Sequence, residues 1–349
     1  MAKSEFADFP GRHSQRKALR ISSGSLVTIG PLFTDKAIPL CIRPSVAGVS
    51  LLDWARANRD LIESHLLQHG ALLFRGFGDS KVESFELFAE ATSLGGLIDY
   101  SYCSTPRRRV SGNIYTSTEY PADRAIPMHN EMSYARSWPM KIWFCCVKAA
   151  PQGGQTPIAD SRKVLERLDP HLVSRFERLG VLYVRNFLDN IDLSCREVFG
   201  TADRDEISRL CDAVGIEYEF NDHCQLKTRQ KCQGIAIHSS KMHSIWFNQA
   251  HLFHISSLGP GMAASFLADF GEDCLPRNAY YGDGSKIDEM HLNEIREAYR
   301  QETIAFPWNE GDILMLDNMQ VAHGREPFAG PRKIIVAMAE QSFQESAQA

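Results

Sequence analysis

Apolar residues recur at helical spacing through much of the first hundred residues. Between residues 51 and 69 they share one helical face, and Gly70 follows as a stop signal. A second amphipathic helix is predicted over 82–94. The apolar run between these helices, at 71–77, predicts a buried strand. The chain therefore opens with a helix, a strand and a helix.

Strand signals are more frequent in the rest of the chain. Runs of apolar, β-branched and aromatic residues predict strands at 141–149, 245–255, 313–316 and 333–339. Helices are predicted at about 161–179, 204–214 and 287–300. Strands and helices do not alternate regularly, and no glycine-rich nucleotide loop is present, which disfavours a doubly wound fold. The pattern favours an α+β fold with a mostly β core, a sandwich or barrel that carries the site.

Two segments stand apart from this core. Residues 1–25 are polar and end in a Ser/Gly linker, so we expect a flexible N-terminal arm followed by a single domain over 26–349. The stretch at about 186–235 is polar, partly helical and longer than an ordinary connection. We predict that it is a lid insertion that closes over the substrate.

Composition excludes several classes of protein. The chain has 349 residues, of which 44% are hydrophobic and 23% charged, unlike a disordered chain or a coiled coil. A net charge of −5 gives no general reason to expect nucleic acid or an anionic membrane as a partner. No apolar run reaches the ~20 residues of a membrane span, and the N-terminus lacks the apolar core of a secretory signal. Nine cysteines without framework spacing suggest reduced thiols and a cytoplasmic location.

His129 and Glu131 are the first candidates for chemistry. Two residues apart on an extended strand, their side chains would point to the same face. His323 is a candidate third ligand. Two imidazoles and one carboxylate leave open metal positions, as in non-haem Fe(II) oxygenases. Short His-x-acid strings also arise by chance, so a structural role remains open on this evidence.

Arg332 and Thr156 form a second candidate group. Arg332 follows His323 by nine residues and falls next to a predicted strand. A guanidinium binds a carboxylate bidentately, so it could hold the far carboxylate of a metal-chelating 2-oxo acid. Thr156 could donate a second hydrogen bond to that group. A surface ion pair for Arg332 and a turn for Thr156 are the alternatives.

Six strings in a fixed order carry a family resemblance. They are GALLFRGF, TPRRRVSGNIYTSTEYPADRAIPMHNEMSY, APQGGQTPIADSR, IWFNQAHLFHISSL, NAYYGDGS and MLDNMQVAHGREPFAGPRKIIVAM. From about residue 70 to 340 the chain resembles the TauD/TfdA-type Fe(II)- and 2-oxoglutarate-dependent dioxygenases. Within them it is most similar to the branch of syringomycin-type aspartyl β-hydroxylases, also called clavaminate-synthase-like. The resemblance implies a distorted double-stranded β-helix, or jelly roll, with flanking helices.

The resemblance also implies site residues and a reaction. His129, Glu131 and His323 match the iron ligands, and Thr156 and Arg332 match the groups that hold the far carboxylate of 2-oxoglutarate. Many members have Asp in place of Glu131, and related halogenases lack this carboxylate, so halogenation is disfavoured. The implied cofactors are Fe(II), 2-oxoglutarate and O2. The implied reaction is hydroxylation of an unactivated C–H bond in an amino acid or a derived small molecule, with release of succinate and CO2, in natural-product biosynthesis.

Further residues are expected around the substrate. The resemblance suggests a pocket lined by Asn113, Tyr115, Thr116, Ser117, Glu119, Phe247 and Asn248. A hydrogen-bonded loop and, at Asn248, a satisfied buried amide are the alternatives. The basic run 107–109 is read as a solvated surface, with a carrier protein or its phosphopantetheine arm as the other interpretation. A second copy of the chain is a further partner suggested by relatives.

Rival interpretations remain. The same iron centre supports desaturation, cyclisation, epoxidation or oxidative cleavage. A jelly-roll binder without turnover and a zinc hydrolase are the alternatives from other classes. Two other metal sites are disfavoured: His251 and His254 would face opposite ways on a strand, and His223, Cys224 and Cys232 lack a fourth ligand. Cys145 and Cys146 are predicted to be core thiols.

Overall fold

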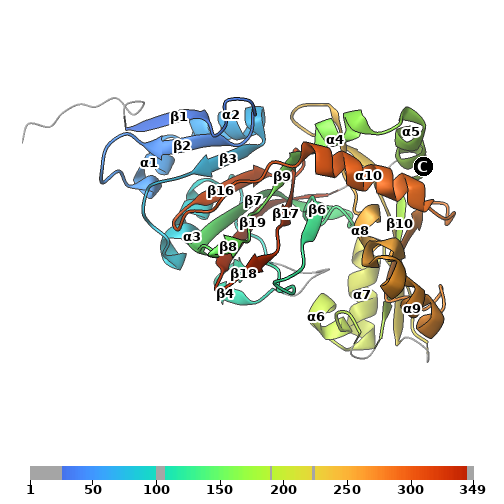
Figure 1. Ribbon diagram of the computed structural model, residues 1–349. Coiled ribbons are helices and arrows are strands. Elements are labelled where there is room, and N and C mark those ends of the chain that lie inside the picture. The colour runs from blue at the N-terminus through green and yellow to red at the C-terminus, as the bar shows by residue number, and fades with distance from the viewer. Residues whose placement is uncertain (1–25, 100–106, 189–190, 222–224, 344–349) are drawn as a thin grey trace, which may run out of the picture.

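The computed structural model describes residues 26–99, 107–188, 191–221 and 225–343. The predicted arm over 1–25 lies outside these residues. Two bodies of secondary structure stand side by side in Figure 1, a β-sandwich and a smaller group of strands and helices. The sandwich contains His129 and His323.

The larger layer of the sandwich is an eight-stranded sheet. Its order is β1 (Val27–Pro31), β2 (Leu40–Pro44), β3 (Ala71–Phe74), β16 (Ile313–Asp317), β7 (Ser137–Lys148), β19 (Lys333–Phe343), β5 (Ile114–Thr116) and β4 (Arg109–Ser111). Neighbouring strands are antiparallel except β2 and β3, which are parallel.

The smaller layer of the sandwich consists of short strands. A three-stranded sheet runs β6 (Ile126–His129), β17 (Val321–Arg325) and β9 (Ile158–Asp160), and β18 (Phe328–Ala329) pairs with β8 (Gln152–Gly153). One hydrophobic cluster contains Ile158 and Val321 from this layer together with Phe144 and Leu316 from the large sheet. The two layers therefore enclose a common core, as the predicted jelly roll requires.

Successive side chains along the strands of the large sheet point to opposite faces, and each face is part of a separate hydrophobic core. On β16, Leu314 and Leu316 face the core between the layers, while Ile313 and Met315 face the opposite side. That outer side is covered by α1 (Leu51–Ala57), α2 (Arg59–His69) and α3 (Val82–Ala91). Both faces are buried, which explains why this strand reads as a continuous apolar run.

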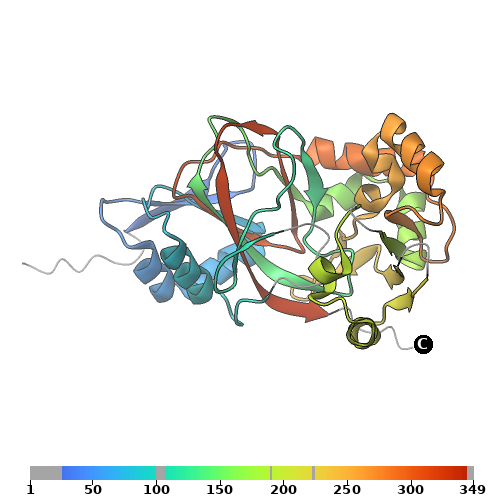
Figure 2. The ribbon, with the colours of Figure 1, turned by 90° about the horizontal axis from the view of Figure 1, so that it is seen from below.

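A second group of elements packs beside the sandwich (Figures 1 and 2). Its four-stranded sheet runs β11 (Glu217–Glu219), β12 (Leu226–Cys232), β10 (Val181–Phe187) and β15 (Arg277–Tyr281), and a hairpin joins β13 (Ile235–Ile237) to β14 (Ser244–Trp246). Its helices are α4 (Ser161–Arg167), α5 (Pro170–Leu179), α6 (Cys195–Phe199), α7 (Arg204–Val214), α8 (Ala250–Phe253), α9 (Pro260–Phe270) and α10 (Glu289–Glu302), with a short 3-10 helix at Ile255–Leu258.

Several predicted elements differ in their extent. The helix expected over 51–69 is interrupted at Asn58, and that over 161–179 breaks before Pro170, which begins α5. The strand predicted over 245–255 is wrong beyond Trp246, because the chain turns there and continues as α8. The segment predicted as a lid, 186–235, holds helices and also strands of the four-stranded sheet.

Candidate active site

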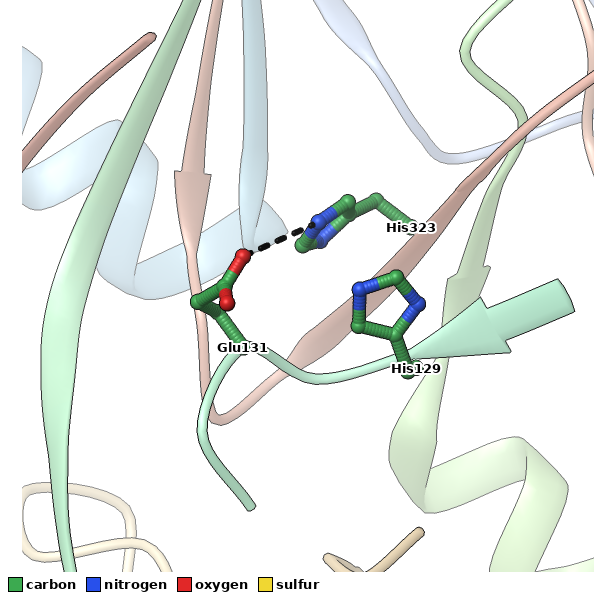
Figure 3. A group of neighbouring side chains, drawn as sticks. All are labelled: His129, Glu131 and His323. Carbon is green, nitrogen blue, oxygen red and sulfur yellow. Dashed lines mark ion pairs between the residues drawn. The ribbon is translucent and has the colours of Figure 1, made fainter. Parts of the chain in front are cut away.

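His129 and His323 face each other across a pair of antiparallel strands. β6 and β17 place the two residues directly opposite one another, and their ring centroids lie 4.6 Å apart (Figure 3). His323 is also flanked by the ring of Phe144, at 4.9 Å between centroids. The sandwich therefore brings together two histidines from distant parts of the sequence.

Glu131 reaches the same point from a turn. β6 ends at His129, and Met132 has a φ of 57°, so the chain bends away immediately after Glu131. The sequence-based argument that His129 and Glu131 share one strand face is therefore wrong in its geometry. The turn brings Glu131 Oε2 to 3.9 Å from His323 Nε2, and one candidate ligand atom from each of the three residues lies within 4.8 Å of the others.

Asn318 fixes the turn that carries Glu131. Its Nδ2 donates to the carbonyl of Glu131 at 2.9 Å and to that of Pro139 at 2.8 Å, while its Oδ1 accepts from the Glu131 N–H at 2.7 Å. Asn130 donates back to the Asn318 carbonyl at 2.6 Å, and Gln249 donates to the Asn130 carbonyl at 2.8 Å. Four of these residues (Asn318, Asn130, Gln249 and Glu131) are buried, so the network is shielded from water.

The donor set suits a divalent metal ion. The carboxylate of Glu131 is 3% exposed and His323 is 4% exposed. Burial lowers the pKa of His129 and, more strongly, of His323, so both imidazoles are neutral and can offer a lone pair. His129 Nδ1 lies 2.8 Å from the Pro127 carbonyl, which assigns the proton to Nδ1 and leaves Nε2 as the ligand atom.

The chemistry of the donor set indicates which metal fits. Two imidazoles and a carboxylate are the ligands that Fe(II) takes in oxygenases with open coordination positions. The residues therefore fit the iron that the resemblance implies.

Arg332 and Thr156 line the pocket that contains His129 and His323. Arg332 Nε donates to the Gly154 carbonyl at 2.9 Å, and burial lowers the pKa of its guanidinium to about 10, so the group remains charged at neutral pH. Thr156 is 3% exposed and its Oγ1 accepts from Trp308 Nε1 at 3.1 Å. The hydroxyl proton is then left to donate to a ligand.

Gly154 is required for this arrangement. Its φ is +71°, a backbone conformation that residues other than glycine rarely adopt. A Cβ added at this position would lie 3.0 Å from Cδ and Nε of Arg332. The glycine pair in APQGGQTP therefore lets the main chain approach the guanidinium. The two residues predicted to hold 2-oxoglutarate share one pocket with the histidines, as the carboxylate of a metal-bound dicarboxylate would require.

Only some of the residues predicted to contact the substrate lie at the pocket. Ser117 lines the pocket, and Arg332 Nη1 donates to its hydroxyl at 3.4 Å. The other members of that loop have partners elsewhere. Asn113 donates to the Leu97 carbonyl at 3.0 Å, Tyr115 packs in the core between the layers, Thr116 accepts from the Arg108 N–H at 2.9 Å, and Glu119 pairs with Arg108 at 3.0 Å.

Phe247 and Asn248 lie in the core of the second group of elements. Phe247 packs edge-on against Trp138 with ring centroids 4.9 Å apart. Asn248 donates to the Gly234 carbonyl at 2.7 Å and accepts from the Ala250 N–H at 3.0 Å. The structure thus gives both residues packing partners and does not place them among the residues that line the pocket.

The other histidines and cysteines considered in the sequence either do not belong to the triad or fall outside the described residues. His251 is buried on α8 and its Nε2 lies 3.0 Å from the Met128 carbonyl. Cys145 and Cys146 lie in β7 and burial raises the pKa of both thiols to about 12, which confirms them as core thiols. His223 and Cys224 fall outside the described residues, so the disfavoured zinc site is not tested.

Arg107 is the site residue that the sequence argument missed. The run 107–109 was predicted to be solvated, but the side chain of Arg107 is only 2% exposed. It lines the pocket and forms an ion pair with Glu131. Arg108 is 81% exposed and Arg109 55%, as predicted for a surface run. Nothing in the string RRR distinguishes the first arginine, because its burial depends on the tertiary fold.

Comparison with known proteins identifies the family. The model of the family described as taurine catabolism dioxygenase TauD, TfdA family matches residues 34–338. The chain belongs to this family. It is therefore a non-haem iron dioxygenase that uses Fe(II), 2-oxoglutarate and O2, and the predicted family is confirmed.

Two relatives place the chain more closely. It is 37% identical over 313 residues to the dapdiamide synthesis protein DdaC of Enterobacter agglomerans, covering 86% of this chain and 95% of that protein. It is 29% identical over 325 residues to a clavaminate synthase-like protein of Arabidopsis thaliana, covering 88% and 94%. These similarities support the clavaminate-synthase-like branch.

Solved structures show the same fold. PvcB from Pseudomonas aeruginosa superimposes with a TM-score of 0.55 at 16% identity, covering 91% of this chain and 93% of that chain. A second structure of PvcB, described as an Fe, alpha-ketoglutarate dependent oxygenase from an isonitrile synthetic pathway, gives a TM-score of 0.54. The predicted jelly-roll fold is confirmed for the overall architecture. In the part of the chain that is described, no helix is long and apolar enough to cross a membrane.

The Asn318 network leads to a prediction about metal affinity. Asn318→Ala should weaken Fe(II) or Mn(II) binding by roughly 10–100-fold, because the turn that presents Glu131 loses both of its hydrogen bonds to the Asn318 side chain. Titration of metal into the metal-free protein measures the effect. Gln320→Ala is the matched control, because Gln320 is buried nearby but donates to Asp317 and Leu67 instead of the Glu131 turn. Equal losses in both variants would show that Asn318 has no special part in presenting the carboxylate.

Proposed function

We propose that this chain hydroxylates an unactivated C–H bond of an amino acid or an amino-acid-derived small molecule, in a biosynthetic pathway for a natural product. The names of two similar proteins support the setting, since DdaC is a dapdiamide synthesis protein and PvcB belongs to an isonitrile synthetic pathway. A cytoplasmic location is part of the same proposal, and the substrate is either a free small molecule or one bound to a carrier protein.

The observation that carries the proposal is one pocket with two kinds of ligand group. His129, Glu131 and His323 would hold Fe(II), and Thr156 and Arg332 would hold the far carboxylate of 2-oxoglutarate. When bound, the iron couples activation of O2 to oxidative decarboxylation of 2-oxoglutarate, which provides the oxidant for C–H chemistry.

The protein's own part is positioning and exclusion of water. His129 and His323 line a pocket whose walls also include Phe144 and Ile334, so part of the space beside the histidines is bounded by apolar side chains. The permanent charge of Arg332 and the hydroxyl of Thr156 fix one end of the co-substrate, which orients the other end towards the triad. A buried pocket of this kind favours reaction at the C–H bond that the walls present.

The same centre permits other outcomes of hydrogen abstraction. Hydroxylation adds one oxygen to the substrate, whereas desaturation and cyclisation remove two hydrogens. The mass of the product therefore separates hydroxylation from desaturation and cyclisation once a substrate is found. Release of succinate during a screen of amino acids and their derivatives identifies that substrate.

The segment at 186–235 is proposed to close over the substrate. It contributes α6, α7, β11 and β12 to the group of elements that stands beside the sandwich (Figure 2). Limited proteolysis should show slower cutting in this segment when Fe(II), 2-oxoglutarate and substrate are bound under anaerobic conditions. An unchanged cutting pattern, in a sample shown to have bound all three, would argue against closure by this segment.

The cofactor site can be tested without a substrate. Anaerobic addition of Fe(II) and then 2-oxoglutarate should produce a weak metal-to-ligand charge-transfer band that saturates with 2-oxoglutarate. His323→Ala should abolish the band through loss of a ligand. Arg332→Gln should instead raise the 2-oxoglutarate concentration required by about 10–100-fold, because a charge-assisted hydrogen bond contributes about 1.5–3 kcal/mol.

The control for this experiment is Arg124→Gln, which removes an exposed guanidinium near the pocket and should leave the titration unchanged. A band of wild-type strength and affinity in Arg332→Gln would remove this residue from the co-substrate site. A protein that binds iron but shows no band would favour the alternative of a jelly-roll binding protein.

A further inference from the structure

Arg107 has a place at the site that the functions assigned above do not explain. We propose that Arg107 and the metal ion are alternative partners of the same carboxylate oxygen of Glu131, so that the guanidinium holds the carboxylate in position and metal binding displaces it. The inference rests on the metal site proposed above, and it assigns a role to a residue outside the ligand set.

The same oxygen of Glu131 faces both Arg107 and His323. Arg107 Nη2 donates to Oε2 of Glu131. The same Oε2 is the oxygen that lies 3.9 Å from His323 Nε2 (Figure 3). A metal ion bound by His323 and Glu131 together would take this oxygen, because it is the one that faces the histidine. The guanidinium and the ion would therefore both approach this one oxygen, where their positive charges repel each other.

The charge of Arg107 opposes a cation at this position. The guanidinium of Arg107 lines the same pocket as His129 and His323, and its side chain is 2% exposed. A divalent ion between these imidazoles would experience the positive potential of this guanidinium, which is weakly screened by solvent because the side chain is buried. Removal of the guanidinium should therefore strengthen metal binding, the opposite of what is expected for a residue that supports a ligand.

The ion pair also has a structural role. Glu131 is 3% exposed, and a buried carboxylate without a counter-ion is strongly destabilising. Arg107 supplies that counter-ion and keeps the carboxylate at the site before a metal arrives. The variant without Arg107 should accordingly be less stable without metal and should gain more stability when metal binds.

Displacement has a consequence for the co-substrate. The side chain of Arg107 is 2% exposed, so the guanidinium remains beside the metal as a buried cation after it leaves Glu131. Arg332 is a second cation in the same pocket. A dianion such as 2-oxoglutarate would compensate this excess of positive charge. Binding of metal and of 2-oxoglutarate should therefore be coupled, and part of the coupling should depend on Arg107.

The test compares two neighbouring arginines. Mn(II), which is stable in air, is titrated calorimetrically into the full-length metal-free wild type, Arg107→Gln and Arg108→Gln. Arg108 is the matched control, since its loss changes the charge equally but its side chain is 81% exposed and paired with Glu119. Arg107→Gln should bind Mn(II) on the order of tenfold more tightly than wild type. Arg108→Gln should stay within about twofold of wild type.

Equal or weaker Mn(II) binding by a folded Arg107→Gln protein would overturn the proposal, because a supporting role for Arg107 predicts a loss of affinity. Melting curves provide a second readout: Mn(II) should raise the melting temperature of Arg107→Gln more than that of wild type. If the glutamine variant does not fold, Arg107→Met removes the charge while it fills more of the buried space, and it should also bind Mn(II) more tightly than wild type. Wild-type affinity or less in that variant would count equally against displacement.

The outcomes separate this inference from the proposed function. A wild-type protein that binds no Mn(II) contradicts the metal site itself, whereas binding that is insensitive to Arg107 contradicts only the competition. A further titration of Mn(II) at saturating 2-oxoglutarate measures the coupling. The co-substrate should tighten Mn(II) binding by a larger factor in wild type than in Arg107→Gln, and equal factors would exclude an effect of the displaced guanidinium on 2-oxoglutarate.

Discussion

The pairing of β17 with β6 is the contact on which the site depends. It sets His323 opposite His129, although the two residues lie almost two hundred positions apart in the sequence. Gly324 makes the close approach possible, because a Cβ there would lie 2.7 Å from the Ile126 carbonyl oxygen. The short strands are supported from the other side of the sandwich, whose common core includes Phe144 and Val321.

Glu131 joins this pair through side-chain hydrogen bonds and not through strand geometry. Asn318 lies in the turn between β16 and β17. The turn that leads into the strand of His323 therefore also forms hydrogen bonds with the turn that carries Glu131. The positions of the two strand-borne histidines and of the carboxylate are consequently set by one connected network. Because Asn318, Asn130, Gln249 and Glu131 are buried, the hydrogen bonds among them do not compete with water.

Charge is the second constraint on the pocket. Three arginines, Arg107, Arg325 and Arg332, line the pocket, and the triad's carboxylate, Glu131, is paired with the first of them. Arg325 donates to main-chain carbonyls of the 120–124 loop, whereas Arg332 donates to the Gly154 carbonyl and the Ser117 hydroxyl. A pocket of this composition favours anionic ligands, which agrees with a dicarboxylate co-substrate bound at a divalent metal.

Helices with one apolar face and strands with a continuous apolar run were predicted from the local sequence. The helix over 204–214 matches α7, and the apolar runs at 313–316 and 333–339 lie within β16 and β19. The strand predicted over 245–255 is wrong beyond Trp246. The apolar residues that follow are buried in the second group of elements, but they lie in a turn and a short helix. The family strings supplied the triad, Thr156 and Arg332. The roles of Asn318 and Arg107 were not readable, since an amide or a guanidinium becomes a site residue only through partners that the fold brings near.

The most direct test of this account is the position of the metal. Crystals grown anaerobically with Fe(II) and N-oxalylglycine, an analogue of 2-oxoglutarate, would be measured at the iron absorption edge. The account predicts a single strong anomalous peak within coordination distance of His129 Nε2, Glu131 and His323, with the far carboxylate of the analogue on Arg332 and Thr156. An iron peak elsewhere, or one at the histidines without Glu131 as a ligand, would contradict the central claim.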